Sequence, residues 1–485
     1  MSAPVFRVIS IELYERNVRL RLPFRFGAAT LTACPQAFVR VRIAFADGRS
    51  ALGASAELLV PKWFDKAPNR SNADNIVDLR RALAFATEAY TGHGKALTAF
   101  GHFSAHYDAL FTAGAAAGQN ALTVNFGPAL IDRAILDALC HALDVSFERA
   151  VRANLPGIGA SQTPDLAGFD LAAFLGGLTT STTIAARHTV GIVDPITRAD
   201  VMTGVDDGLP ETLEEVIASY GNRHFKLKLG GDPETDIARL ARIAGVLDRL
   251  PRYFVTLDGN EQYADVAAVV GFCRRLATTP ALARLAASTL FLEQPLPRAT
   301  ALGVDVTELA RGRPLLIDES DATLDAFPAA RARGYSGVSS KSCKGVYKSL
   351  LNAARCARWN AENGAHRYFL SAEDLTMQAG LAVQQDLALV ALLGLRHVER
   401  NGHHYVNGFV GAGADAAEQQ RGLAAYPSLY VRAHGGVRLS IRDGMINLRG
   451  LDTPGFASAA APDWSTLKPF VSPFADLAQT GSATS

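Results

Sequence analysis

The stretch His224–Asp232, HFKLKLGGD, holds two lysines that alternate with apolar residues. Successive side chains of a β-strand point to opposite faces, so Lys226 and Lys228 would share one face of a strand and the apolar residues the other. Two ammonium groups on one face repel each other. Taken alone, the pattern also fits an edge strand with charged residues on its open face, so its meaning depends on the strands around it.

Four more short apolar stretches downstream end in a charged residue in the same way. They are YFVTLD, TLFLE, PLLID and GVSSK, which end at Asp258, Glu293, Asp318 and Lys341. Loop or helix signals follow each of them, and successive stretches lie about one βα unit apart. Consecutive parallel strands would therefore bring five charged side chains, including that of Lys228, to one rim of the sheet.

The region from about residue 185 to residue 400 alternates between short apolar strands and helical segments. Such alternation predicts parallel strands that are joined by right-handed helical crossovers. Eight units over roughly 250 residues match the size of a (β/α)₈ barrel. We therefore predict a protein of the α/β class with a TIM-type barrel at residues 126–425.

The region before the barrel is expected to begin with antiparallel strands. Residues 7–20 and 37–57 alternate apolar and polar side chains, and Asp47-Gly48 is a hairpin turn signal inside the second stretch. Residues 23–32, PFRFGAATLT, are expected to form a loop between the strands.

A helical pattern follows these strands from about Asn75 to Thr112. Strands followed by helices predict an N-terminal α+β capping domain at residues 1–125. The last part of the chain returns to short strands. We expect a C-terminal segment at residues 426–485 that packs on the cap and the barrel.

Composition limits the kinds of partner that the chain can have. Its 485 residues carry 48 Lys and Arg against 47 Asp and Glu, a formal net charge of +1. This balance leaves no electrostatic footprint for nucleic acid or an anionic membrane, so the expected partner is a small molecule. The five cysteines lack CxxC spacing, which argues against a zinc site or disulfide framework and for a reduced, intracellular protein. No secretory signal or stretch of roughly 20 apolar residues is found, so we expect a cytoplasmic protein.

Three carboxylates, those of Asp258, Glu293 and Asp318, would converge on the predicted rim. They cannot all stay ionised at close range without a compensating cation. Oxygen ligands on separate strands, with no Cys or His nearby, favour a hard divalent ion, Mg²⁺ first and Mn²⁺ as the alternative. A dication and a second ammonium would disfavour the charged form of Lys228, which could then act as a base. Taken alone, Asp258 or Asp318 could be a helix cap, and Glu293 in LEQP could be a strand end before a turn proline.

These motifs resemble those of the enolase superfamily. KLK, LDGNEQY, LEQPLP, IDES and SSKSCKG are similar to the motifs of its muconate-lactonizing branch, which has KxK on the second barrel strand, acidic residues ending the next three and a lysine ending the sixth. The resemblance implies that the three carboxylates bind Mg²⁺. It also implies that Lys228 and Lys341 face each other across the substrate as acid/base catalysts, with Lys226 as the auxiliary catalytic lysine of the KxK.

The resemblance implies an enzyme that removes the proton α to the carboxylate of a small substrate through an enediolate intermediate. Two lysines that exchange roles suit a racemase, epimerase or cycloisomerase. A lyase of the same superfamily, such as an acid-sugar dehydratase or an o-succinylbenzoate-synthase-like enzyme, is the alternative. A non-catalytic barrel that keeps the site for ligand binding is a third reading. A homo-oligomer is also expected.

Substrate contacts are expected from the cap and from the ends of the strands. PFRFG is similar to the capping-domain loop that closes over the active site of the family. No histidine ends the seventh strand as in the mandelate-racemase branch, and the Asp-x-Asp of dipeptide epimerases is missing from the eighth. The candidate substrate-binding residues are Arg25, Trp63, Asn260, Glu373, Glu399 and His403. For the last two strands, a cap, a surface charge or a supporting role is an equally good reading.

Overall fold

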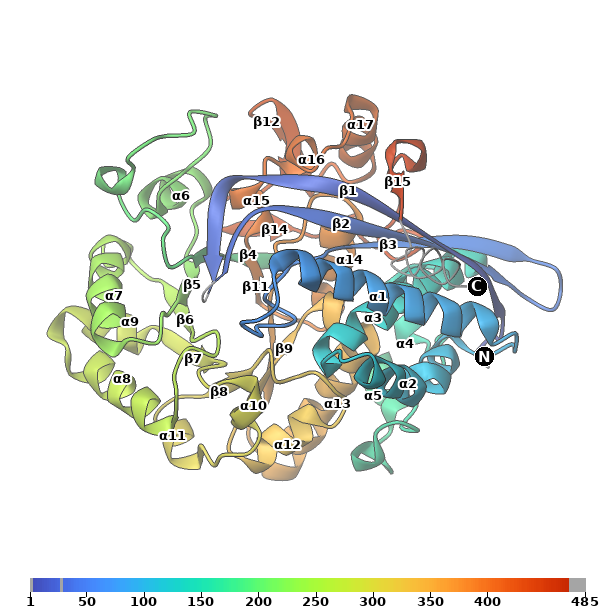
Figure 1. Cartoon of the computed structure of the whole chain (residues 1–485), viewed down its shortest axis with the longest axis horizontal. Coiled ribbons are helices and arrows are strands. Elements are labelled where there is room, and N and C mark those ends of the chain that lie inside the picture. The colour runs from blue at the N-terminus through green and yellow to red at the C-terminus, as the bar shows by residue number, and fades with distance from the viewer. Residues whose placement is uncertain (1–2, 27–28, 471–485) are drawn as a thin grey trace, which may run out of the picture.

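The computed structural model describes residues 3–26 and 29–470 of the chain (Figure 1). An antiparallel sheet of long strands lies across the molecule beside the barrel. Its order is β15-β1-β2-β3, with bounds β1 (Arg7–Phe26), β2 (Ala29–Ala44), β3 (Ser50–Leu58) and β15 (Lys468–Pro469). The predicted hairpin joins β2 to β3 at Asp47-Gly48, where Gly48 has a φ of 88°, a conformation that glycine adopts without strain.

Residues 23–26 and 29–32 differ from the sequence prediction of a loop, because they continue β1 and β2. The pairing of the two strands extends to Phe26 opposite Ala29. Phe24, Phe26 and Leu31 are all buried. Burial of these large apolar side chains on one face favours extended, paired backbone over a loop.

Three helices cover the cap sheet, α1 (Asn72–Gly92), α2 (Ala99–Ala116) and α3 (Ala121–Leu143). A capping box at Ser71 and Asp74 begins α1. Helix α3 is buried along most of its length and lies directly against β3. At the contact, a Cβ on Gly53 would lie 2.2 Å from the carbonyl oxygen of Ala134, so only glycine permits this approach.

Eight parallel strands form a closed barrel after the cap. The strands are β4 (Thr183–Val190), β5 (His224–Lys228), β6 (Phe254–Asp258), β7 (Thr289–Glu293), β8 (Leu315–Ile317), β9 (Gly337–Ser340), β10 (Phe369–Ala372) and β11 (His397–Arg400). Neighbours pair in chain order, and β11 pairs with β4 to close the ring. The predicted (β/α)₈ barrel with an N-terminal cap is confirmed.

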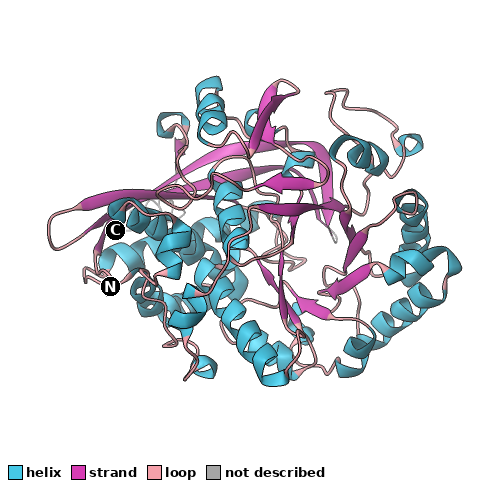
Figure 2. Ribbon diagram, turned by 180° about the vertical axis from the view of Figure 1, so that it is seen from behind, coloured by secondary structure: helices cyan, strands magenta, loops and turns pink. Residues whose placement is uncertain are grey.

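Helices surround the barrel strands, as the view from behind shows (Figure 2). They are α6 (Leu213–Tyr220), α7 (Pro233–Leu247), α8 (Val266–Thr278), α9 (Ala283–Ala287), α10 (Arg298–Ala301), α11 (Thr307–Gly312), α12 (Ala326–Ala332), α13 (Val346–Asn363) and α14 (Leu381–Leu392). Local signals set their ends: Asp232 caps α7 with Pro233 in its first turn, and Gly364 ends α13 with a φ of 62°.

Shorter elements connect the cap to the barrel. They are α4 (Phe147–Arg152), the 3₁₀ segment η1 (Pro164–Leu166) and α5 (Leu171–Gly176). Further 3₁₀ segments lie within the barrel, η2 (Arg198–Asp200), η3 (Pro280–Leu282) and η4 (Ser342–Lys344), and in the C-terminal region, η5 (Trp464–Thr466). One continuous apolar cluster includes Val41 of the cap sheet, Ile131 of α3, Leu350 of α13 and Leu387 of α14. Because this core crosses between them, the cap is held firmly against the barrel.

The C-terminal region contacts both parts of the molecule. Its elements are α15 (Gly402–Tyr405), α16 (Gly408–Gly411), α17 (Ala416–Ala425), β12 (Tyr430–Ala433), β13 (Gly436–Leu439) and β14 (Met445–Asn447). Strand β14 pairs with β4 of the barrel, whereas β15 pairs with β1 of the cap. Residues 471–485 lie outside the described residues, and the domain boundaries at 125/126 and 425/426 stay predictions.

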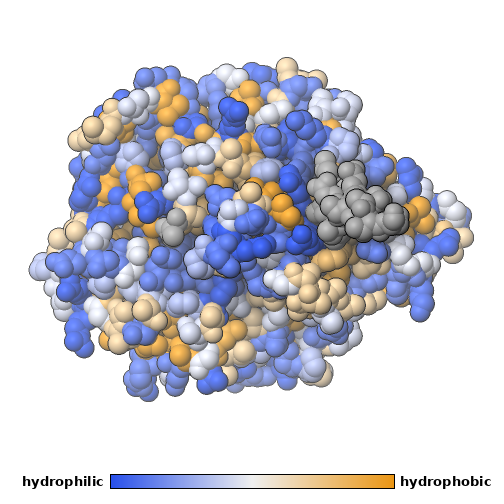
Figure 3. All heavy atoms as spheres, in the orientation of Figure 1, coloured by the Kyte–Doolittle hydropathy of each residue, from blue (hydrophilic) through white to orange (hydrophobic). Residues whose placement is uncertain are grey.

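The surface is mixed in polarity. On the face in Figure 3, hydrophilic residues predominate and apolar residues are scattered among them. Within the described part of the chain, no single helix has the length and apolar character to cross a membrane, although the bent pair Val266–Thr278 and Pro280–Ala287 meets these criteria of length and composition together.

Candidate active site

The register of the barrel strands places charged residues side by side at the carboxyl-terminal rim. Lys228 lies opposite Asp258, and Asp258 opposite Glu293, in the pairing of β5, β6 and β7. Asp318 follows β8 directly, and Lys341 follows β9 directly. All five are buried, with at most 8% of their surface exposed. The structure thus brings these five residues together.

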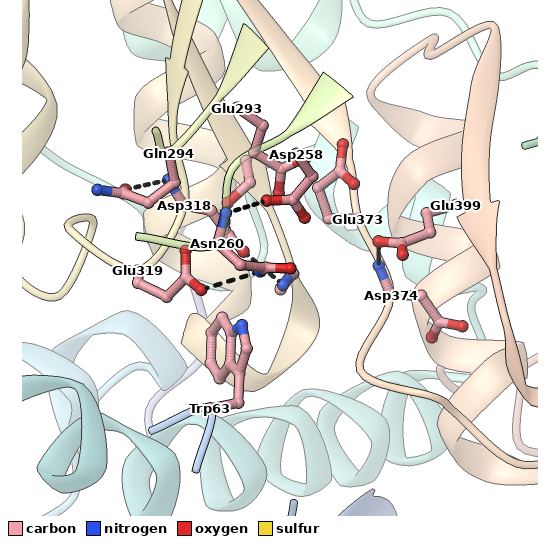
Figure 4. Close-up of polar contacts among 12 residues, drawn as sticks. Trp63, Asp258, Asn260, Glu293, Gln294, Asp318, Glu319, Glu373, Asp374 and Glu399 are labelled. Atoms are coloured by element: carbon pink, nitrogen blue, oxygen red, sulfur yellow. Dashed lines mark hydrogen bonds and ion pairs between the residues drawn. The ribbon is translucent and has the colours of Figure 1, made fainter. Parts of the chain in front are cut away.

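Lys228 and Lys341 approach the barrel mouth from opposite sides. In the closed ring of eight strands, β5 and β9 are separated by three strands in either direction. The three strands on one side are those that carry Asp258, Glu293 and Asp318. Three carboxylates therefore lie along the rim between two ammonium groups, and Figure 4 shows the acidic side chains converging.

Lys226 lies deeper in the barrel and contacts four carboxylates at once. Its Nζ is 2.9 Å from Glu293 Oε1, 2.7 Å from Glu373 Oε2, 3.0 Å from Glu399 Oε2 and 3.0 Å from Asp258 Oδ2. Burial lowers the pKa of Lys226, but the four negative charges outweigh burial and raise this pKa well above its usual value. Lys226 is therefore a permanent positive charge inside the barrel.

Asp258 resolves the repulsion between the two lysines of the KxK. Its Oδ2 lies 2.6 Å from the Nζ of Lys228 and 3.0 Å from that of Lys226. Burial raises the pKa of Asp258, yet the two ammonium groups more than offset it and hold this pKa below its usual range. One buried carboxylate thus compensates both lysines.

Lys341 is paired in the same manner on the other side. Its Nζ lies 2.6 Å from Asp318 Oδ2, and the Nζ of Lys344 lies 3.5 Å from Asp318 Oδ1. Burial lowers the pKa of Lys341, but the attraction of Asp318, together with that of Glu399 and Glu293, outweighs burial and raises this pKa. The indole ring of Trp63 covers the ammonium, with its centroid 4.1 Å from Nζ, a cation–π contact.

Glu293 carries the least compensated negative charge of the rim. Burial raises its pKa well above the usual value, and repulsion from Asp258 and Glu373 raises it further, because Lys226 alone does not balance them. A buried carboxylate of this kind either binds a proton or attracts a cation. The site therefore favours additional positive charge at Glu293.

The rim carboxylates have the chemistry of a magnesium site but are held by lysines here. Among residues 3–26 and 29–470, no three His, Cys, Asp or Glu side chains are arranged to hold a metal ion as they stand. The ammonium groups of Lys226, Lys228 and Lys341 lie against the carboxylates instead. Oxygen donors on adjacent rigid strands and the charge excess at Glu293 fit a hard divalent ion, provided the lysines release their partners.

A small cavity of about 20 Å³ opens onto both lysines. Its polar lining is Lys228, Lys341, Asp374, Thr376, Glu399 and Asn401, and its apolar lining is Phe24, Phe26, Val60, Trp63 and Leu375. A space of this size holds about one water molecule. The apolar side chains come from the cap and from the segment after β10, so the two lysines face an apolar wall.

Two of the expected substrate contacts lie at this cavity, Trp63 and Glu399. Glu399 Oε1 accepts from Thr189, and its Oε2 accepts from the amide of Asp374. Asn260 is buried beside the site, where its backbone N–H donates to Asp258 Oδ1 at 2.8 Å, so it supports a rim carboxylate.

The structure does not bring Arg25, Glu373 and His403 to the cavity. Arg25 is exposed, because alternation along β1 turns Phe24 and Phe26 inward and Arg25 outward. Glu373 is occupied by Lys226 and Arg187 below the cavity. His403 lies in a separate buried cluster, with its ring 6.3 Å from that of His188 and 5.3 Å from that of Tyr220.

Sequence reasoning missed several lining residues. Phe24 and Phe26 were assigned to a loop, although their spacing of two is the signal of a strand with one inward face. Asn401 and Thr376 follow the ends of β11 and β10, but nothing in their local sequence separates them from ordinary turn residues.

The family model described as "Enolase C-terminal domain-like" matches residues 208–423, which include seven of the barrel strands. Residues 208–423 are thus similar to the barrel domain of the enolase superfamily. The motif resemblance to its muconate-lactonizing branch is thereby confirmed.

Individual relatives agree with this assignment. A hydrophobic dipeptide epimerase of Citrifermentans bemidjiense is 29% identical over 184 residues, which span 38% of this chain and 46% of that protein. The match therefore spans about half the length of this curated relative. The crystal structure of a muconate lactonizing enzyme from Mucobacterium Smegmatis, complexed with muconolactone, has a TM-score of 0.59 at 17% identity and covers 94% of this chain and 98% of its own.

A second solved structure has the same fold as this chain. It is an enolase from Bradyrhizobium, complexed with magnesium and mandelic acid, with a TM-score of 0.59, 17% identity, and coverage of 96% of this chain and 98% of its own. The matched members of the superfamily are enzymes, among them epimerases and cycloisomerases. The chain is thus placed among enzymes whose reactions differ.

Proposed function

We propose that the chain is a magnesium-dependent racemase, epimerase or cycloisomerase that removes the proton α to a substrate carboxylate. The observation that carries the proposal is the position of Lys228 and Lys341, which flank one cavity from opposite strands of the barrel. Two amines on opposite sides of a carbon atom can remove its proton from one face and return a proton to the other. Three rim carboxylates between them supply the site for a divalent ion.

Asp258, Glu293 and Asp318 would hold the ion. A bound Mg²⁺ supplies positive charge that stabilises the oxyanion formed when a carboxylate loses its α proton. Asp318 Oδ2 cannot pair closely with Lys341 and bind the metal ion strongly at the same time. When Lys341 is released from Asp318, it loses an interaction that raises its pKa, and this loss favours its neutral, basic form.

Lys226 holds the rim carboxylates in place while Lys228 and Lys341 transfer protons. Its four contacts hold Asp258, Glu293, Glu373 and Glu399 together from below. A charge buried this deeply does not move toward the substrate. We therefore assign Lys226 a supporting role at the site and assign proton transfer to Lys228 and Lys341.

The cavity lining supports a substrate with an apolar substituent. Phe24, Phe26, Val60 and Leu375 present only carbon to the space beside the lysines. An apolar wall favours an apolar group and disfavours an acid sugar rich in hydroxyl groups, which would leave hydroxyls without partners. The name of the curated relative, a hydrophobic dipeptide epimerase, supports including hydrophobic dipeptides among the substrates tested.

The test is exchange of the α proton in D₂O. The purified protein with Mg²⁺ is incubated with single enantiomers of hydrophobic dipeptides and apolar carboxylic acids, and products are followed by proton NMR, mass and optical rotation. Deuterium at the α carbon with loss of optical purity supports the proposal. Loss of water from the substrate would assign a lyase instead, and absence of exchange across the panel would contradict proton abstraction.

Matched variants test the two-lysine assignment. Lys228→Met and Lys341→Met should each abolish racemisation, because each removes the group that serves one face. The exposed Lys95→Met is the control and should retain full activity. Full racemisation in either site variant would refute the assignment.

A further inference from the structure

The cap segment at residues 60–68 covers the cavity through Trp63. The side chain of Trp63 is 4% exposed, and its ring lies over the ammonium of Lys341. Figure 4 shows Trp63 facing the acidic strand ends from the side of the cap. The placement of this segment therefore decides whether the reacting lysine is covered or open.

Arg298 holds the backbone of this segment. It begins α10, after β7, and its Nη1 donates to the carbonyl oxygen of Phe64 at 2.8 Å and its Nη2 to that of Trp63 at 2.9 Å. Glu261 fixes the same guanidinium, accepting from Nε at 2.8 Å and from Nη2 at 2.7 Å. A planar guanidinium with donors on both edges can join a carboxylate to two carbonyls, which an ammonium cannot do.

Lys66 is the second anchor of the segment. Its Nζ lies 2.7 Å from Glu261 Oε2, 3.0 Å from Glu319 Oε1 and 2.8 Å from the carbonyl oxygen of Asn260. Asn260 and Glu261 follow Asp258 in the chain, and Glu319 follows Asp318. The segment is therefore tied to the two loops that carry rim carboxylates.

Burial separates these contacts from ordinary surface ion pairs. The side chains of Glu319 and Glu261 are 0% and 6% exposed, while those of Lys66 and Arg298 are 25% and 22% exposed. Removing Lys66 would leave the buried Glu319 without a cation among the described residues, and removing either cation would leave the buried Glu261 with only one, whereas exposed pairs contribute little. The four side chains form a connected unit, which we call the clamp: Lys66, Glu261, Arg298 and Glu319.

The clamp borders the larger of two cavities of very different size. The inner cavity, at the lysines, has about 20 Å³, whereas an outer cavity of about 580 Å³ is lined by Lys66 and Glu261 of the clamp. Phe26 lines both of them. A substrate with several non-hydrogen atoms fits the outer space but not the inner one, so the segment must move for binding.

We propose that the clamp positions Trp63 over Lys341 and closes the inner cavity, and that its release admits the substrate from the outer cavity. Arg298 is the central positioning residue, because it bonds to the carbonyl oxygens of both Trp63 and Phe64, whereas Asn120 donates to that of Phe64 alone. The inference rests on the proposed role of Lys341, but the contacts that carry it are independent of the reaction. A test is therefore possible without turnover.

The test measures how well acrylamide quenches the fluorescence of Trp63. The chain has three tryptophans, so Trp359→Phe and Trp464→Phe leave Trp63 as the single emitter in the full-length protein. In this background Arg298→Gln should increase the Stern–Volmer constant several-fold, because the segment loses its hold. The matched control is Arg313→Gln, which also removes an arginine bonded to two carbonyls, those of Thr289 and Ala286, and should leave quenching unchanged.

Several outcomes decide the proposal. Unchanged quenching in Arg298→Gln, with a native far-UV circular dichroism spectrum, would overturn it, and so would an equal increase in the Arg313 control. Should Arg298→Gln fail to fold, Glu261→Gln keeps the shape of the side chain and must give the same increase. Increased quenching in a protein that exchanges no α proton would uphold the clamp and refute only the proposed function.

Discussion

Replacing Lys226 by methionine tests the internal charge of the barrel most directly. Methionine keeps the approximate volume and apolar stem but removes the ammonium that four carboxylates share. Three of the four keep another partner: Asp258 keeps Lys228, Glu373 keeps Arg187, and Glu399 keeps the hydroxyl of Thr189. Glu293 has no second cation within ion-pair distance among the described residues.

The expected loss follows from that uncompensated carboxylate. Breaking one buried ion pair by removing a single partner costs about 3–5 kcal/mol of unfolding free energy. The pKa of Glu293 is already raised in the native state, so its stabilising contribution exists at low pH and is lost as pH rises through that value. The deficit of Lys226→Met should therefore be largest in neutral and alkaline solution and shrink on acidification.

Urea unfolding followed by far-UV circular dichroism measures both effects. The variant and the wild type are compared at two pH values, at the acidic and the alkaline end of the range in which both proteins stay folded, because a carboxyl group of raised pKa loses its proton as the pH rises. The exposed Lys95→Met is the control for loss of one lysine. A deficit below about 0.5 kcal/mol at the higher pH, the range of surface substitutions, would refute the reasoning, as would a large deficit that does not change with pH.

Three other predictions follow from buried groups, close packing and the rim. Burial lowers the pKa of His188 to about 3, so the free energy of unfolding should fall as the pH drops below about 6.5. In urea unfolding, His188→Gln should reduce the slope of this decline by up to about 1.4 kcal/mol per pH unit. The exposed His366→Gln is the control and should leave the slope unchanged. Gly53→Ala should lower the free energy of unfolding by about 1–3 kcal/mol or more in thermal unfolding, because its Cβ would lie 2.2 Å from the backbone of α3. Gly245→Ala, where a Cβ meets open space, should be neutral or stabilising. Similar losses of stability in both variants would contradict the packing argument. Saturating Mg²⁺ at ~100 times its Kd should stabilise the wild type by about 2.7 kcal/mol in thermal unfolding and Asp318→Asn by much less; a wild type that does not respond would argue against the metal site.

The strand ends could be predicted because their signals are local. Each of β5 to β9 is a short apolar run beside a turn or helix signal, and parallel strands in one barrel end at one rim. The partners of Lys226 could not be predicted in the same way. Glu373 and Glu399 lie 147 and 173 residues further along the chain, and they reach Lys226 only because the barrel closes.

The cap likewise has features that its local sequence predicts and features that only the tertiary structure decides. The alternation in β1 was readable as far as residue 20, but the proline and glycine of PFRFG outweighed the alternation of Phe24 and Phe26. Burial against the barrel mouth decided in favour of strand. Arg25 was consequently predicted to face the substrate, whereas it lies on the outer face of the same strand.

Sequence alone determined the class of fold, the resemblance to a family and the charged residues at the barrel rim, because hydrophobic period, turn residues and strand-end positions are properties of short segments. Tertiary structure alone decided which charges meet. It placed Asp258 between Lys226 and Lys228, set Trp63 over Lys341, and turned HFKLKLGGD from a strand with two repelling charges into part of a compensated network. Such contacts depend on the distance between atoms from remote segments, and Coulomb energy and burial act only at that distance.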